Sequence, residues 1–84
     1  MEDFSYEEKL ILLQYAIEKY NSEDMLKEKL NGLLSSKDIE RSIDTLLATQ
    51  KVRRIGNDTI QNNISHIGEL PEIPESLKPT IEKL

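Results

Sequence analysis

The residues best suited to binding chemistry in this chain include a short basic cluster. Lys51, Arg53 and Arg54 form the densest group of positive charges, and no acidic residue follows until Asp58. Ammonium and guanidinium groups bind phosphate oxygens, so the cluster predicts a small phosphate-binding site. The alternative is that these charges keep a strand edge from pairing with other chains.

A second polar set recurs at helical spacing earlier in the chain. At about 100° per residue, one helix face gathers two cations, a hydroxyl and a small residue: Lys37, Arg41, Thr45 and Ala48. An arginine can bind two acceptors of a guanine, and a threonine can bind a base edge or a phosphate. The carboxylates of Asp38, Glu40 and Asp44 flank this row and repel phosphates. A solvated or protein-contacting face with mixed charges is therefore the alternative to a DNA-reading face.

No set of residues predicts catalysis. The chain has no cysteine and one histidine, so we expect no disulfide, no cysteine-based metal site and no cysteine–histidine nucleophile pair. The serines and threonines have no candidate base at a recognisable spacing, and no glycine-rich phosphate loop is present. We therefore expect no enzyme activity, no metal or other cofactor, and no small-molecule substrate.

Length and charge limit the remaining classes of function. The 84 residues have room for one domain with one modest core. A net charge of −5 argues against broad coating of nucleic acid, although a few basic residues on one face can outweigh the average. No apolar run is long enough to span a bilayer, and the acidic N-terminus MEDFSYEEK does not resemble a secretory signal. We expect a cytoplasmic protein with no membrane partner.

The elements that position these residues begin with a helix over residues 5–20. Ser5-Tyr6-Glu7-Glu8 is a capping-box pattern that favours a helix start. Apolar residues at spacings of three and four form its expected core stripe, which consists of Tyr6, Leu10, Leu13, Ile17 and Tyr20. Ile11, Leu12 and Tyr15 project away from that stripe. This second apolar face is expected either to be sandwiched within the domain or to contact a second copy or a protein partner.

Two more helices and a hairpin are expected next. The second helix ends at Asn31-Gly32, where glycine suits a helix stop. The third helix has a buried stripe formed by Ile39, Ile43, Leu46 and Leu47. Gly56-Asn57-Asp58 is a turn cluster between two β-favouring segments and predicts a hairpin. We expect Ile55 and Ile60 of this hairpin to share one core with the helices.

Residues from about 5 to 61 resemble the winged helix-turn-helix family, especially its small prokaryotic or archaeal members. The resemblance rests on LKEKLNGLLSSKDIERSIDTLLATQKVRRI followed by GND and TIQ. It implies an α+β fold, mainly α with a small β-hairpin, in which three helices and a wing occupy residues 1–67. The helix from Lys37 to Gln50 would be the recognition helix, and Ile55 to Ile60 the wing tip. Members of the family include transcription regulators and subunits that bind proteins with the same surface.

The last residues, 68–84, are expected to form an extended C-terminal tail. A final strand is expected just before it, over residues 62–68, with His66 on the surface. The segment ELPEIPESLK has proline at every third position, which favours a polyproline-like course, and Pro79 can begin a last helical turn. The tail is expected to be either a strap packed on the domain, a linker, or a linear motif that binds a partner.

The motif alternative rests on a second resemblance. LPEIPESL is similar to the proline-containing motif with which ESCRT-III proteins bind the three-helix MIT domain of their disassembly ATPase. The tail residues that would contact such a partner are Leu70, Pro71, Ile73, Pro74 and Leu77.

Two functions are expected from these observations. The leading one is a non-enzymatic DNA-binding or DNA-associated protein, similar to a transcription regulator or an accessory factor. Its contacts to double-stranded DNA would come from Lys37, Arg41, Thr45, Lys51, Arg53 and Arg54. The alternative is a protein-interaction module, or an accessory subunit of replication, transcription or ESCRT-type machinery. It would use the second apolar face of the first helix and the tail.

Overall fold

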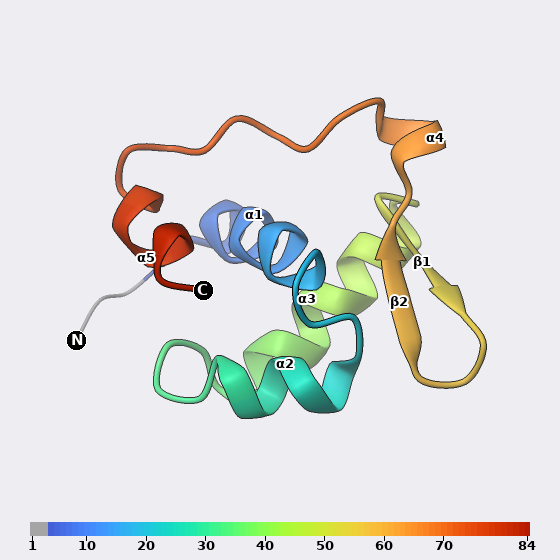
Figure 1. Ribbon diagram of the computed structural model, residues 1–84, viewed down its shortest axis with the longest axis horizontal. Coiled ribbons are helices and arrows are strands. Elements are labelled where there is room, and N and C mark those ends of the chain that lie inside the picture. The colour runs from blue at the N-terminus through green and yellow to red at the C-terminus, as the bar shows by residue number, and fades with distance from the viewer. Residues whose placement is uncertain (1–3) are drawn as a thin grey trace.

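Three helices followed by an antiparallel hairpin give the chain a winged-helix-like arrangement (Figure 1). The computed structural model describes residues 4–84. Its elements in chain order are α1 (Tyr6–Ile17), α2 (Glu23–Lys29), α3 (Ser36–Ala48), β1 (Val52–Ile55), β2 (Thr59–Asn62), α4 (Ile64–Ile67) and α5 (Lys78–Glu82). The expected fold class, mainly α with a small β-hairpin, is confirmed.

A serine starts each of the three main helices. Ser5, Ser22 and Ser35 each accept a hydrogen bond from the backbone N–H three residues on, at 3.1, 3.2 and 3.1 Å. At α1 the side chain of Glu8 also accepts from the Ser5 N–H at 2.8 Å, which completes the expected capping box. These caps fix where each helix begins, and hence which residues of α3 face outward.

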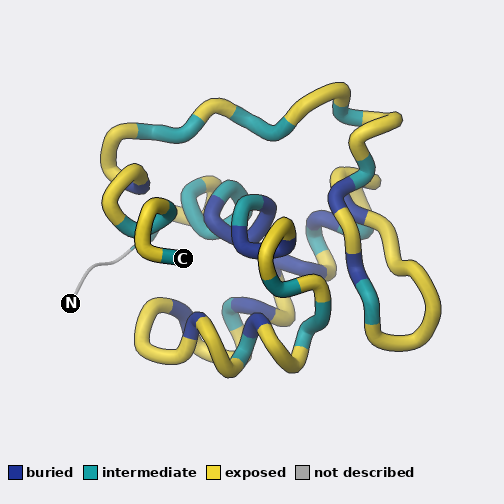
Figure 2. Tube along the Cα trace, viewed as in Figure 1, coloured by how far each residue is buried: buried dark blue, intermediate teal, exposed yellow. Residues whose placement is uncertain are grey.

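The core lies where α1, α2, α3 and the hairpin face one another (Figure 2). Its buried members are Leu12, Leu13, Ala16, Ile17, Leu26, Leu30, Leu34, Ile39, Ile43, Leu46, Val52 and Ile60. The expected stripe of α3 is confirmed, with Leu47 half-buried at its margin. Leu10 and Tyr20 are also half-buried at the margin, whereas Tyr6 is 52% exposed and lies outside the core.

The prediction that Ile55 belongs to the core is wrong, because its side chain is 42% exposed. In the hairpin Arg54 pairs with Ile60 and Val52 pairs with Asn62. Successive side chains of a strand point to opposite faces, so Val52 lies on the same face as the buried Ile60 and Ile55 lies on the other. Val52 therefore fills the core position that was expected for Ile55.

A buried amide network joins the hairpin to α1. The Asn62 Nδ2 donates to the backbone carbonyl of Gln14 at 2.8 Å and to Glu18 Oε2 at 2.9 Å. Gln14 Nε2 donates in turn to Asn62 Oδ1 at 3.5 Å. Gln14 and Asn62 are each only 3% exposed, so these bonds satisfy polar groups that would otherwise be costly to bury. The network fixes the direction in which the wing leaves the domain.

The connections around the hairpin are short. Gly56 begins the turn with φ +70°, a conformation that glycine adopts without strain. On its outer side β2 meets the linker before α2, where the Ile60 N–H donates to the Asn21 carbonyl at 2.8 Å and Ser22 forms an isolated bridge with Thr59. The linker before α2 thus extends the two-stranded sheet by a single bridge.

The expected last strand over residues 62–68 is wrong beyond Asn62, which ends β2. One turn of helix, α4, follows instead. The carbonyl of Asn63 accepts from the N–H groups of His66 and Ile67 at 2.9 and 3.0 Å, and its side chain accepts from the Ser65 hydroxyl at 3.0 Å. Such local bonds compete with a strand ladder. His66 is exposed, as expected.

The tail returns across α1 before it forms α5 (Figure 1). The Tyr15 hydroxyl donates to the Pro71 carbonyl at 2.5 Å, and the Ser76 hydroxyl donates to Glu8 Oε2 at 2.5 Å. Leu77 is completely buried. The tail therefore lies as a strap over α1, and the second apolar face of that helix is covered within the chain.

Candidate nucleic-acid interface

The outward face of α3 carries the two cations that the spacing predicted. Lys37 and Arg41 are exposed, together with Asp44 and Ala48. Thr45 is only half-buried and turns toward α1, where its hydroxyl contacts the hydroxyl of Tyr6. The exposed row on α3 is therefore shorter than predicted, because Thr45 contacts Tyr6 of α1 instead of facing solvent. Sequence reasoning placed Tyr6 in the core because it matched the period of the stripe.

Two of the three carboxylates that flank this row are engaged by neighbouring helices. Asp38 forms an ion pair with Lys9 of α1 at 3.2 Å, and Glu40 forms one with Lys27 of α2 at 2.7 Å. Asp44 is exposed and takes part in no ion pair within residues 4–84. The outermost residues of α3 therefore carry a small positive excess.

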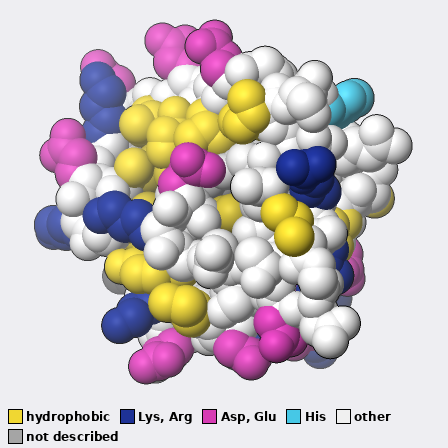
Figure 3. All heavy atoms as spheres, turned by 45° about the vertical axis from the view of Figure 1, so that its right-hand side comes forward, with side chains coloured by type: hydrophobic (Ala, Val, Ile, Leu, Met, Phe, Trp, Pro, Cys, Tyr) yellow, Lys and Arg dark blue, Asp and Glu magenta, His cyan; other side chains and the backbone are white. Residues whose placement is uncertain are grey.

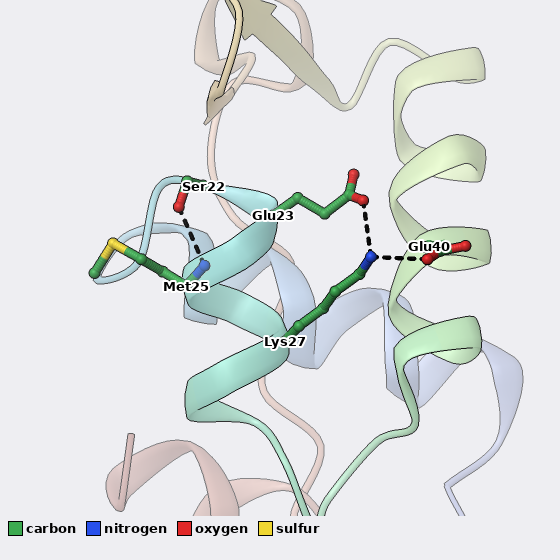
Figure 4. A network of polar contacts seen from close by, with 5 residues as sticks. All are labelled: Ser22, Glu23, Met25, Lys27 and Glu40. Carbon is green, nitrogen blue, oxygen red and sulfur yellow. Dashed lines mark hydrogen bonds and ion pairs between the residues drawn. The ribbon is translucent and has the colours of Figure 1, made fainter.

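Lys27 bridges two elements. Figure 4 shows its ammonium group between Glu40 of α3 and Glu23 of α2, the latter at 3.2 Å. The hydrogen bonds to Glu40 and then to Glu23 raise the pKa of Lys27, and the hydrogen bond from Lys27 lowers the pKa of Glu40. The pair within α2 is readable from the sequence as an i, i+4 spacing, but the bond to Glu40 depends on how α2 packs on α3.

The hairpin separates the basic cluster that the sequence places together. Arg53 and Arg54 are adjacent in β1, so they point to opposite faces of the ribbon. Arg53 donates from Nε and Nη2 to Gln61 Oε1 across the hairpin, at 3.2 and 3.0 Å. Lys51 precedes β1 and is exposed. Lys51 and Arg53 are thus available to solvent, but the three cations do not form one patch.

Arg54 has an acidic environment. It lines a shallow cavity of about 260 Å³ together with Ser22, Glu23, Asp24 and Asp58. The carboxylates come from the first turn of α2 and from the turn of the hairpin. An anion approaching from this side meets the carboxylates of Asp24 and Asp58 as well as that of Glu23, which also pairs with Lys27, so Arg54 is poorly placed to hold a phosphate. The linear sequence gives no sign of this, because Arg54 is about 30 residues from the start of α2.

Charges of both signs mix on the surface. Figure 3 shows Lys and Arg side chains interspersed with Asp and Glu on one face of the molecule, with hydrophobic side chains between them. No continuous basic surface is visible on that face. Any nucleic-acid contact there must therefore depend on individual cations rather than on a broad positive field.

The residues expected to bind a protein partner are mostly covered. Leu12 and Leu77 are both 0% exposed, so neither offers a surface to a partner in this fold. Leu12 belongs to the core that α1 shares with α2, α3 and the hairpin, and Leu77 is buried at the start of α5. The other residues expected to contact a partner are half-buried: Ile11, Tyr15, Leu70, Pro71, Ile73 and Pro74.

Within residues 4–84 no three His, Cys, Asp or Glu side chains are grouped so that they could hold a metal ion. No helix in the same range is long and apolar enough to cross a membrane.

No protein-family model, curated protein or solved structure matches this chain. The winged-helix-like description therefore rests on the order and pairing of its own elements.

Proposed function

We propose that this protein is a non-enzymatic, DNA-associated protein that presents α3 to the major groove of double-stranded DNA. The observation that carries the proposal is the outward face of α3. Lys37 and Arg41 are exposed there, while the carboxylates of Asp38 and Glu40 are held in ion pairs with α1 and α2. An α-helix fits the major groove of B-form DNA, where each base pair presents a distinct pattern of donors and acceptors.

Each side chain has a role in this proposal. Arg41 binds a guanine in the major groove. Asp44, one turn further along the same face, accepts a hydrogen bond from the amino group of a cytosine. Lys37, Lys51 and Arg53 hold phosphates and set the position of the domain on the duplex. Transcription regulation and an accessory role at DNA are both compatible with such a module.

The wing provides a matched pair of variants that tests the proposal. Binding of a random-sequence duplex is measured by fluorescence anisotropy between about 50 and 200 mM salt, where each lost phosphate contact reduces the log–log salt slope by about one. Arg53→Ala should lower the slope by about one. Arg54→Ala, the adjacent control, should lower it by clearly less, because Arg54 faces the carboxylates of Glu23, Asp24 and Asp58.

Two results would overturn the proposal. One is the absence of measurable duplex binding by the folded protein even at low salt. The other is a larger loss of slope in Arg54→Ala than in Arg53→Ala, which would place the DNA on the acidic side of the hairpin.

The protein-interaction alternative through α1 and the tail has less support. Leu12 and Leu77 are fully buried, and the tail is bonded to α1 through Tyr15 and Pro71. A partner at this site would first have to displace the tail from α1.

A further inference from the structure

A groove lies between α5 and the loop that follows α2. Figure 1 shows these two segments at the end of the molecule opposite the hairpin. Its volume is about 280 Å³, and it is lined by Tyr20, Lys29, Leu33, Pro79, Thr80, Lys83 and Leu84. One wall comes from the end of α2 and the loop after it, and the other comes from α5 and the two residues that follow it.

The lining combines positive charge with apolar surface. Lys29 and Lys83 contribute one ammonium group from each wall, and neither forms an ion pair within residues 4–84. No Asp or Glu lines the groove, although the chain carries a net charge of −5. Leu33, 40% exposed, and Leu84 supply apolar surface beside these charges. The complementary ligand has an apolar group flanked by carboxylates.

The open form of the groove favours a peptide over a free small molecule. Small-molecule pockets usually enclose most of the ligand, whereas this groove is open to solvent. A space of this volume holds one or two side chains of a longer segment. The hydroxyls of Tyr20 and Thr80 also suit a peptide backbone, because they can both donate and accept hydrogen bonds.

We propose that this groove binds an acidic peptide segment of a partner protein. A bulky apolar side chain of the segment packs against Leu33 and Leu84, and neighbouring carboxylates pair with Lys29 and Lys83. The site is separate from the outward face of α3 and from the wing, so binding of a peptide and binding of DNA do not compete for the same residues. The protein then serves as an adaptor that links an acidic partner to DNA.

The groove exists only because the tail is docked. Its second wall is α5, which is held against α1 by the fully buried Leu77 and by a 2.5 Å hydrogen bond from Lys19 Nζ to the Leu84 carbonyl. The tail thereby has a role beyond covering α1, since it completes the peptide site.

A titration of the full chain with a defined peptide tests the proposal. The peptide is acetyl-Glu-Asp-Leu-Phe-Asp-Glu-amide, and its control is the amide isostere acetyl-Gln-Asn-Leu-Phe-Asn-Gln-amide. Backbone amide signals are followed by NMR. The acidic peptide should shift the signals of Leu33, Thr80 and Leu84 and leave those of the hairpin in place. The isostere should bind at least tenfold more weakly.

Paired variants separate this site from the proposed DNA site. Lys29→Gln with Lys83→Gln should weaken peptide binding at least tenfold and leave duplex binding unchanged. Lys37→Gln with Lys51→Gln removes the same charge elsewhere, and it should retain peptide binding while weakening duplex binding. All four lysines are exposed, so both variants keep the fold, which the NMR spectrum verifies.

Several outcomes would overturn the peptide site whatever happens with DNA. These are the absence of binding by the acidic peptide, shifts confined to other surfaces, equal affinity for the isostere, and equal weakening by the two double variants. Loss of duplex binding alone, with peptide binding retained, would count against the DNA proposal only.

Discussion

Ser42 of α3 is a polar residue in an apolar environment. It is 1% exposed, and its hydroxyl has no hydrogen-bond partner within residues 4–84. A buried polar group without a partner costs about 1–3 kcal/mol, since it has lost its bonds to water. Natural chains keep few such groups.

Ser42→Ala should therefore stabilise the protein by about 1 kcal/mol or more, measured as the free energy of unfolding in urea. Part of any gain is the higher helix propensity of alanine, which the pair Asp44→Ser and Asp44→Ala measures at an exposed position of the same helix. A Ser42→Ala protein that is less stable, or that gains no more than the difference at position 44, would show that the hydroxyl finds a partner in solution.

At the level of the secondary-structure elements, the backbone is strained where α3 ends. Gln50 has φ +61° and occupies the left-handed position that ends the helix. The Gln50 N–H donates to the Leu47 carbonyl at 3.1 Å, and the Lys51 N–H donates to the Leu46 carbonyl at 2.9 Å, as in a Schellman motif. A residue with a Cβ pays for this conformation, and glycine does not.

Gln50→Gly should raise the free energy of unfolding by about 1 kcal/mol, measured by urea denaturation. Gly32→Ala is the opposite control. Gly32 has φ +96°, and an added Cβ would meet no atom within 4 Å, so the backbone conformation alone should destabilise that variant. Loss of stability in Gln50→Gly would mean that the glutamine side chain contributes more than the strain costs.

The start of α1 makes its link to the tail dependent on pH. Glu8 accepts hydrogen bonds from the Ser76 hydroxyl and from the Ser5 N–H, and these two bonds, in that order, lower the pKa of its carboxyl below the ordinary value of 4.5. A lowered pKa in the folded state contributes stability that is complete above 4.5 and is lost as the pH falls through the folded-state pKa.

Glu8→Gln should therefore flatten the dependence of the free energy of unfolding on pH below 4.5, with little change in slope at neutral pH. Glu7→Gln is the matched control, because the exposed Glu7 makes no side-chain hydrogen bond within residues 4–84. Equal flattening in both variants would assign the effect to net charge and not to the bonds of Glu8.

At the scale of the whole molecule, the tail determines whether α1 is covered. Removing residues 69–84 should lower the free energy of unfolding by several kcal/mol, since burial of one leucine such as Leu77 contributes about 1.5–3 kcal/mol. The exposed face around Ile11 and Tyr15 should then cause self-association, whereas we expect the full chain to sediment as a monomer. Urea denaturation and sedimentation measure the two effects, and an unchanged unfolding midpoint would contradict the role of the tail.

Local patterns in the sequence predicted much of the fold. The capping box at Ser5, the α3 stripe and the turn at Gly56 depend on residues close together in the chain, and all are found. The placement of Leu12, Ile55 and Leu77 depends on distant partners. Ile55 depends on the register of the hairpin, Leu12 on how α1 packs against the other helices and the hairpin, and Leu77 on the return of the tail. None of these three is encoded by a local period.

The candidate site shows the same limit. The exposure of Lys37 and Arg41 follows from helical period alone. The ion pairs of Asp38 and Glu40 and the acidic environment of Arg54 arise from packing between elements. The order of charges along the chain therefore overestimated the repulsion of phosphates by α3 and overestimated the attraction of phosphates by Arg54. The groove beside α5 has no local motif, because its lining joins Tyr20 to residues more than 50 positions later.

The contacts of α1 also have a consequence for synthesis of the protein. Asn62, which bonds Gln14 of this helix, is synthesised 48 residues later, and Leu84, which bonds Lys19 just after the helix, follows that lysine by 65 residues. At about 5–20 residues per second the ribosome needs several seconds to supply these partners. During that interval both apolar faces of α1 lack their covers, so a nascent chain exposes this helix to chaperones and to aggregation until the tail emerges.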